Sequence, residues 1–234
     1  MIEWRGEGTV IGARPHGEGA AIVDVFTAPK GRLSGLVHGG AGRRMAAAVQ
    51  PGTDLSLRWR ARSEAALGTI TAEPVRGRAH LLAERVPLLA LASACALLAF
   101  ALPEGEAHPR LHAGTRTLLD ALGDRGWELG YLEWEVLLLG ETGFALDLSC
   151  CAVTGSTEGL AYVSPRTGRA VSEAGAGEWR DRLLPLPPVL LGAEGERPAV
   201  AEGLAVTGHF LGRMAEGLGR PLPEARGRLV RALR

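Results

Sequence analysis

The sequence has few cysteines, few aromatic residues and almost no lysine. Its 234 residues include three Cys, and aromatic residues make up 5% of the chain. Three cysteines, two of them adjacent at Cys150 and Cys151, do not form a disulfide framework, so we expect a reducing compartment. Lys30 is the only lysine among 26 basic residues, which indicates a GC-rich genome. The arginine count alone is therefore weak evidence for a nucleic-acid partner.

Long apolar segments are also missing. The longest uncharged apolar stretch, Leu88–Leu102, has 15 residues, and crossing a bilayer takes about 20. The first twenty residues contain no apolar core of a signal peptide. Hydrophobic residues make up 46% of the chain, the ordinary level for a folded protein. We therefore expect a cytoplasmic protein with no membrane partner.

Sequence signatures of catalysis are absent as well. There is no GxxxxGK[ST] phosphate loop, no HExxH motif and no nuclease-type cluster of carboxylates. Cys95 lies in the apolar run and is predicted to be a core residue. Cys150 and Cys151 are either a reactive pair or simply packed. We predict no catalytic residue, no metal and no cofactor, and hence a protein that is not an enzyme.

What the chain does have is an uneven charge distribution, although its net charge is 0. Residues 1–80 carry 11 basic and 7 acidic side chains, residues 81–148 carry 4 and 10, and residues 149–234 carry 11 and 9. Between Ala28 and Arg62, seven basic residues accompany Asp54 alone. This pattern predicts a polyanionic partner for the N-terminal part. The acidic middle is either a solvated helical surface or a docking surface for another protein.

The first 78 residues have the pattern of short strands separated by Gly- and Pro-rich turns. Strict alternation is clearest in the fourth strand, where Leu55, Leu57 and Trp59 share one face. A short helical turn is expected over Met45–Val49. The predicted strands are Trp4–Arg14 (interrupted by glycines), Ala20–Thr27, Arg32–His38, Thr53–Arg62 and Leu67–Val75. Five short strands with a helical piece between the third and fourth predict an OB-fold β-barrel.

Beyond about Arg78 the apolar runs lengthen and helices are expected. They are predicted over Ala79–Leu102, Arg110–Leu122, Leu129–Leu139, Val200–Leu218 and Glu224–Leu233. A stretch rich in Gly, Ser and Thr, Asp147–Gly177, interrupts them. The predicted class is thus α+β, with an N-terminal barrel at residues 1–78 and an α-helical domain at 79–234 that contains the insertion 147–177.

Basic residues of the N-terminal part are candidates for gripping phosphates. Arg58, Arg60 and Arg62 alternate along one strand face, about 7 Å apart, which is close to the phosphate repeat of an extended strand. The alternative is an ordinary solvated face that this genome fills with arginine. The full candidate set is Arg14, Lys30, Arg32, His38, Arg43, Arg44, Arg58, Arg60 and Arg62.

Aromatic stacking on bases has little support in the sequence. Trp59 lies on the apolar side of its strand, and Phe26 is likewise predicted to be in the core. Trp4 is either a stacking platform or a packed anchor, and packing is favoured. Binding should therefore depend on electrostatics, fall strongly with salt and vary little with base sequence.

Three stretches resemble the RecO family of bacterial DNA repair proteins. The first is Asp24-Val25-Phe26-Thr27 followed by the segment from Gly31 to Arg44, GRLSGLVHGGAGRR. The second runs from Leu137-Leu138-Leu139-Gly140-Glu141 through Asp147 into Cys150-Cys151-Ala152-Val153-Thr154-Gly155. The third, which is less specific, extends from Arg220 to Arg226. These stretches occur in the right order and are distributed along most of the chain, from Asp24 to Arg226.

The resemblance implies an N-terminal OB fold, a helical domain and a zinc-finger-like insertion. It also implies a non-enzymatic protein that binds single- and double-stranded DNA and anneals complementary strands. With RecR, such a protein helps RecA replace the single-strand-binding protein SSB, so the implied partners are DNA, RecR, SSB and, indirectly, RecA. The acidic tail of SSB docks on the family's helical domain, but here Glu133 stands where a basic residue would help.

One departure from the family concerns the metal. Many relatives hold zinc with two CxxC pairs, and a structural zinc site needs four ligands, usually Cys or His. Here Cys150 and Cys151 begin the insertion, Thr154 follows, and no Cys lies near Ser164–Ser172. The finger is therefore predicted to be degenerate and free of metal.

Two other readings of the N-terminal barrel stay open. It could be an OB-fold interaction scaffold whose arginine row is ordinary surface, or an RNA-binding module. The scaffold predicts no salt-dependent affinity for DNA, and the RNA-binding module predicts a preference for RNA over DNA of the same sequence.

Overall fold

The computed structural model describes residues 1–40, 42–63 and 66–234, except for the side chains of Arg43 and Arg44. Its contacts divide the chain into two compact units. The first comprises Met1–Gly123 with Pro223–Leu229, and the second comprises Asp124–Leu222 with Val230–Arg234. Each unit is described by itself below. The division into a domain 1–78 and a domain 79–234 stays a prediction.

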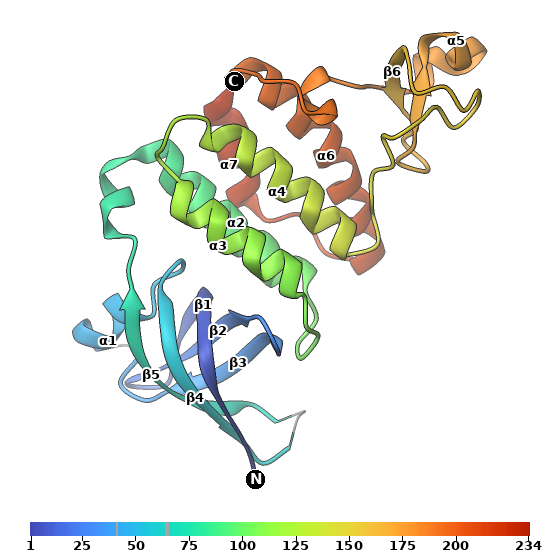
Figure 1. The fold of residues 1–234 in the computed structure, drawn as a ribbon. Helices are drawn as coiled ribbons and strands as arrows, with labels where there is room; N and C mark the ends of the chain where they lie inside the picture. The colour runs from blue at the N-terminus through green and yellow to red at the C-terminus, as the bar shows by residue number, and fades with distance from the viewer. Residues whose placement is uncertain (41, 64–65) are drawn as a thin grey trace. The chain divides into compact units, whose positions relative to one another are not determined.

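The first unit begins with a closed five-stranded barrel (Figure 1). Its strands follow one another in the order β1-β2-β3-β5-β4, and β4 pairs with β1 to close the ring. All neighbouring strands are antiparallel except β3 and β5, which are parallel. The elements are β1 (Ile2–His16), β2 (Ala20–Thr27), β3 (Gly31–Val37), α1 (Arg43–Ala48), β4 (Asp54–Ala61) and β5 (Gly68–Arg76). The five strands and the helical piece between the third and fourth are confirmed.

Strand β1 is long enough to serve two neighbours. Its first half, Ile2–Thr9, pairs with β4, and the half from Thr9 to His16 pairs with β2. The strand continues through its glycines, where an interruption was expected. Glycine is needed at position 8, because a Cβ atom there would lie 2.5 Å from Cγ1 of Val25. This glycine therefore lets β1 pass close to the side chains of β2.

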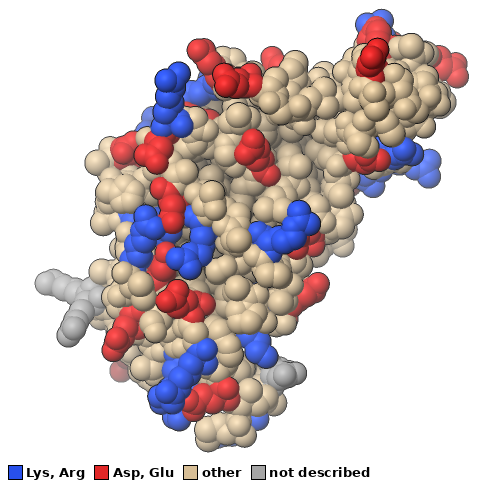
Figure 2. All heavy atoms as spheres, in the orientation of Figure 1, with Lys and Arg blue, Asp and Glu red and all other residues tan. Residues whose placement is uncertain are grey.

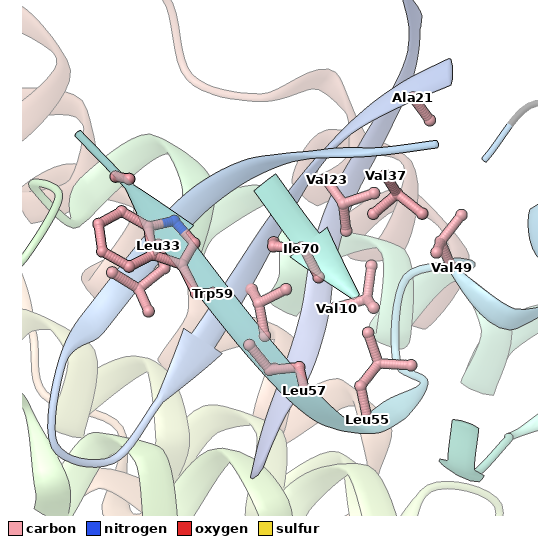
Figure 3. Close-up of a cluster of buried hydrophobic side chains, with 12 residues drawn as sticks. Val10, Ala21, Val23, Leu33, Val37, Val49, Leu55, Leu57, Trp59 and Ile70 are labelled. Carbon is pink, nitrogen blue, oxygen red and sulfur yellow. The ribbon is translucent and has the colours of Figure 1, made fainter. Parts of the chain in front are cut away.

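The interior of the barrel is filled by apolar side chains from every strand (Figure 3). On β4, Leu55, Leu57 and Trp59 are buried, while Ser56 and Arg60 are exposed. The alternation read from the sequence therefore places its apolar and polar faces correctly. Val10, Val23, Leu33 and Ile70 belong to the same core.

Two helices and a short 3₁₀ segment complete the N-terminal part of the first unit. They are η1 (Ala79–Ala83), α2 (Arg85–Ala101) and α3 (Pro109–Ala121). The prediction of one helix over Ala79–Leu102 is wrong, because Glu84 has extended backbone angles, φ −119° and ψ 97°. Pro87 lies in the first turn of α2, where its missing N–H removes no helical hydrogen bond. The helix restarts just before the proline.

Cys95 is buried in α2, as predicted, and burial raises the pKa of its thiol to about 12. Among the residues that the structure describes, no helix combines the length and the hydrophobicity needed to cross a membrane.

The second unit is mainly helical. Its principal helices are α4 (Trp127–Glu141) and α6 (Arg197–Leu218), while α7 (Glu224–Leu233) is divided between the two units. A Cβ atom at Gly203 of α6 would lie 2.5 Å from Cδ2 of Leu132, so glycine permits close packing of α6 on α4. Between them, the buried Thr207 Oγ1 donates a hydrogen bond of 2.6 Å to the Glu135 carboxylate. The predicted helices in this part of the chain are confirmed, as is the α+β class.

The insertion folds as a small subdomain of the second unit. Strands β6 (Leu160–Val163), β7 (Ala170–Ser172) and β8 (Leu184–Pro185) form a sheet in the order β7-β6-β8. The short segments α5 (Glu173–Ala176), η2 (Gly177–Arg182) and η3 (Pro188–Leu191) accompany them. Within residues 1–40, 42–63 and 66–234, no three His, Cys, Asp or Glu side chains are grouped so that they could hold a metal ion. The residues present therefore do not fit the zinc site that the resemblance implies.

The buried sulfur of Cys151 lies at the centre of this subdomain. It accepts hydrogen bonds from the backbone N–H groups of Val153, Thr154 and Ser172 at 3.2–3.4 Å, and from Ser172 Oγ at 3.3 Å. Burial of the thiol opposes ionisation, but the hydrogen bonds from Ser172 and Thr154 outweigh it and lower the pKa of Cys151 to about 6. One sulfur atom thus joins the loop 151–154 to β7.

We expect the thiol of Cys151 to titrate near pH 6 in a Cys150→Ser protein, as measured by thiolate ultraviolet absorbance. An ordinary cysteine titrates at about pH 8.5, so the unfolded chain holds this proton more tightly. The resulting stabilisation is complete above about pH 8.5 and is lost as the pH falls toward 6. The difference in melting temperature between this protein and its Cys151→Ser derivative should therefore increase as the pH is raised from about 6 to about 8.5. A midpoint near 8.5 would contradict the proposed hydrogen-bonded thiolate.

Candidate nucleic-acid interface

The clearest group of basic side chains lies on the outer face of β1 and β4. The register pairs Glu3 with Arg60 and Arg5 with Arg58, so these four side chains share one face. The Glu3 carboxylate lies 2.9 Å from Arg5 Nε, 3.4 Å from Arg58 Nε and 2.7 Å from Arg60 Nε. We call Arg5, Arg58 and Arg60 the arginine cluster. Arg62 follows directly after β4 and is exposed.

Glu3 is a carboxylate held among three guanidinium groups. Hydrogen bonds from Arg60 and Arg5 hold the pKa of Glu3 below its usual range, so it stays ionised at neutral pH. The cluster and Glu3 together carry two net positive charges. In Figure 2, basic and acidic side chains intermingle over the barrel, without a continuous basic field on the face in view. The cluster is therefore a local feature, defined by strand pairing.

Replacing Glu3 with Gln should tighten the binding of single-stranded DNA. Removing the carboxylate frees about one positive charge for a phosphate, which corresponds to about a fivefold gain in affinity near 0.1 M salt. The matched control is Glu73→Gln on the neighbouring strand β5, because Glu73 is exposed and stands opposite Ser56 of β4. Affinities are measured by fluorescence anisotropy. An equal gain in both variants would indicate a general charge effect.

A second group of predicted residues lies in a different part of the barrel. Arg14 is exposed near the β1–β2 turn and stands opposite Ile22 of β2. His38 is exposed directly after β3. The β1–β4 ladder that holds the cluster involves the other end of β1. The side chains of Arg43 and Arg44 lie outside the described residues. Among the candidates whose side chains the structure describes, Arg14 therefore lies on a different part of β1 from the arginine cluster.

Two further candidates differ in their surroundings. Lys30 is exposed in the turn between β2 and β3. Arg32 has a side chain only 20% exposed, and its guanidinium donates to the Ala99 carbonyl at 2.6 Å and to Glu104 at 3.3 Å. Arg32 thus ties β3 to the end of α2 and the loop that follows. A contact with DNA would have to break these bonds, so we leave Arg32 out of the interface proposed below.

The glycine-rich turn after β3 was a candidate for phosphate contact through its amides. Gly39 has a φ of +71°, which favours glycine. The N–H groups of Gly40 and Gly42 donate to the carbonyl groups of Val37 and Gly39, at 3.1 and 2.9 Å. These two amides are therefore used inside the turn.

Reasoning from the sequence missed Glu3 and Arg5. The signal that could have found them is the alternation of β1, in which Glu3, Arg5 and Glu7 point outward on either side of Trp4. Placing them beside Arg58 and Arg60 requires the register of β1 on β4, because a shift by one residue would turn them inward.

Comparison with known sequences agrees with this architecture. The family model described as "Recombination protein O N terminal" matches residues 1–78, and "Recombination protein O C terminal" matches residues 83–222. The chain belongs to the RecO family. The first match covers the whole barrel and ends just after β5. The second match runs from the end of η1 to the residues just before α7.

Individual RecO relatives align with the whole chain. The DNA repair protein RecO of Cereibacter sphaeroides is 53% identical over 231 residues, covering 98% of this chain and 98% of the relative. The DNA repair protein RecO of Dinoroseobacter shibae is 53% identical over 237 residues, covering 100% and 98%. The DNA repair protein RecO of a Ruegeria species is 51% identical over 237 residues, covering 99% and 98%.

Proposed function

We propose that this RecO-family chain is a non-catalytic recombination mediator whose barrel grips DNA phosphates. The observation that supports this most is the arginine cluster, with Arg62 beside it, on an exposed face of β1 and β4. Guanidinium groups on alternate positions of a strand match a row of phosphates, and binding releases the counterions condensed on DNA. Lys30 extends this surface, and Arg14 and His38 supply a second, separate contact.

The fold supports the same proposal. A closed five-stranded barrel with a helix between its third and fourth strands is the architecture of an OB fold, in which oligonucleotides commonly bind. The barrel at residues 1–78 is the proposed DNA-binding domain, and residues 79–234 form the proposed helical domain. The insertion 147–177 is the counterpart of the family's zinc finger, held here by hydrogen bonds to Cys151.

The mechanism uses binding energy alone. Single strands repel each other through their phosphates, and a protein that neutralises some of these charges favours annealing of complementary strands. Single- and double-stranded DNA share the phosphate backbone, so both are proposed ligands. Contacts with RecR and SSB would then allow RecA to assemble where SSB was bound.

The test is a titration of labelled single-stranded DNA, duplex DNA and RNA of matched sequence across a salt series. We expect binding to both DNA forms, a steep fall in affinity with salt and little dependence on base sequence. Acceleration of annealing at the same protein concentration is the functional readout. No binding at low salt would overturn the proposal, and a clear preference for RNA would favour the RNA-binding module.

One observation favours the scaffold alternative. The three arginines of the cluster already have a protein carboxylate, Glu3, within 3.4 Å. If Glu3 serves to neutralise them, the face is ordinary surface and the barrel binds protein. A wild-type chain that forms complexes with RecR but does not bind DNA would support the scaffold alternative.

A further inference from the structure

The barrel wall has a seam between β3 and β5. These strands pair over only two positions, Gly35 with Gly68 and Leu36 with Thr69. Before Gly35, the edge of β3 meets the loop after α2, where the N–H of Gly105 donates to the Arg32 carbonyl at 3.0 Å. Parallel strands that separate early leave space between them, and here that space has to be closed by other groups.

Trp59 closes the seam with its side chain. Its indole Nε1–H donates to the Ser34 carbonyl at 3.0 Å, in place of a backbone N–H from β5. The indole fits because residue 68 is glycine, where a Cβ atom would lie 2.1 Å from Nε1. In the close-up, the ring of Trp59 lies beside Leu33 of β3 (Figure 3). The indole ring of Trp59 therefore forms one wall of the seam, and its hydrogen bond to Ser34 holds the ring in place.

A pocket of about 430 Å³ opens at this seam. Trp59, Trp4 and Leu33 supply apolar walls, and Glu3, Lys30 and Glu104 supply charged groups. Trp4 is opposite Trp59 in the β1–β4 ladder and is partly buried against the barrel core. A volume of this size falls in the range of pockets for small ligands, roughly 300–1,000 Å³. Its mixture of flat aromatic and charged groups suits a flat, polar ligand.

Glu3 connects this pocket to the arginine cluster. It lines the pocket, and the same carboxylate lies within 3.4 Å of all three clustered guanidinium groups. A ligand in the pocket is thus adjacent to side chains suited to phosphate. A nucleotide unit combines these two features, since a flat base is attached to a charged backbone.

We infer that the pocket receives one unstacked nucleobase of a strand whose phosphates lie on the arginine cluster. The inference rests on the proposed function and adds a base-dependent contact to it. The Glu104 carboxylate, whose Oε1 already accepts from Arg32 and Ser34, also accepts from the N–H groups of a base edge. Lys30 donates to the carbonyl or ring nitrogen acceptors of the base. Each base offers such groups and a π-face, so the pocket takes any of the four bases.

The experiment compares two single strands of equal length, one with bases and one fully abasic, in binding to the full chain. Both strands present the same phosphates, so their ratio of affinities isolates the base contact. Stacking of one base on an aromatic side chain predicts about tenfold tighter binding of the base-containing strand. Trp4→Ala should reduce this ratio toward one.

A second variant guards against misfolding of Trp4→Ala. Ala66 also lines the pocket, and Ala66→Phe fills it without removing a packed side chain. This variant should lower the ratio of affinities to one, by weakening the binding of the base-containing strand, and should leave the affinity for the abasic strand unchanged. The control is Trp179→Ala, which removes a 55%-exposed tryptophan of the second unit and should leave the ratio unchanged.

The possible outcomes distinguish failure of the inferred base pocket from failure of the proposed DNA binding. Equal affinity of the wild-type chain for both strands would overturn the pocket and leave the phosphate grip standing. A folded Ala66→Phe protein that keeps the ratio would also overturn the pocket. Binding of neither strand would overturn the proposed function itself. A free nucleoside monophosphate that competes as well as the strand would show that the pocket serves a free nucleotide instead.

Discussion

Replacing Arg58, Arg60 and Arg62 together with Ala should weaken binding of single-stranded DNA about 100-fold near 0.1 M salt. Each lost phosphate contact lowers the slope of log affinity against log salt by about 0.7, so the slope should flatten by about 2. The loss should be the same for unrelated base sequences, because phosphates carry no sequence information. Anisotropy titrations at several salt concentrations measure both quantities.

The fold should survive this triple substitution. The side chains of Arg58 and Arg60 are 38% and 50% exposed, and surface ion pairs contribute about 0–1 kcal/mol. The matched control replaces Arg166, Arg180 and Arg182 of the second unit, which removes the same number of positive charges. A similar loss in the control would point to net charge, and an unchanged slope in the triple variant would remove this face from the interface.

Much of the barrel could be predicted from local pattern. On β4, polar and apolar residues alternate strictly, and a half-exposed strand requires that alternation. The helices at Arg197–Leu218 and Glu224–Leu233 likewise follow from apolar periodicity. The break at Glu84 was missed because the helix of the apolar run Leu88–Leu102 was extended back to Ala79, across the charged residues Glu84 and Arg85. Pro87 was the local signal, since proline belongs in the first turn of a helix.

The site was less predictable, because it is made by pairing between distant segments. Arg58 and Arg60 were visible as a row, but Glu3 and Arg5 come beside them only through the register of β1 on β4. Arg32 looked equivalent to Lys30, two residues away, yet it is bound by the Ala99 carbonyl. Which arginine is free for a ligand depends on tertiary contacts that no local pattern encodes.

Arg78 shows the same limit most strongly. In the sequence it marks the point where strands give way to helices. In the structure its side chain is 2% exposed and its guanidinium donates to the Gly52 and Leu119 carbonyl groups and to the carboxylates of Asp54 and Asp120. Asp54 begins β4 and Asp120 lies near the end of α3. One buried arginine therefore joins the barrel to a helix that follows it.

Replacing Arg78 with Ala should destabilise the first unit by about 3–5 kcal/mol. The change removes the charged donor of the buried Asp54 carboxylate, which keeps only the hydrogen bond from Thr9 Oγ1, and it also removes a donor from two carbonyl groups. Removing one partner of a buried ion pair costs about this much. Because the chain has two units, a single unfolding free energy is poorly defined. Hydrogen exchange of β4 and α3 amides under native conditions measures the local effect, together with urea unfolding.

Arg76 provides the control, because it reaches the same Asp120 from the surface. Arg76 Nη1 lies 2.7 Å from Asp120 Oδ2, but its side chain is 50% exposed, so Arg76→Ala should cost only about 0–1 kcal/mol. Arg78→Lys should fall between the two, since one ammonium group keeps the charge but cannot reproduce the planar fork that reaches four acceptors. Equal losses for Arg76→Ala and Arg78→Ala would mean that burial of the guanidinium adds nothing. The larger loss for Arg78→Ala would assign the junction between barrel and helix to this one side chain.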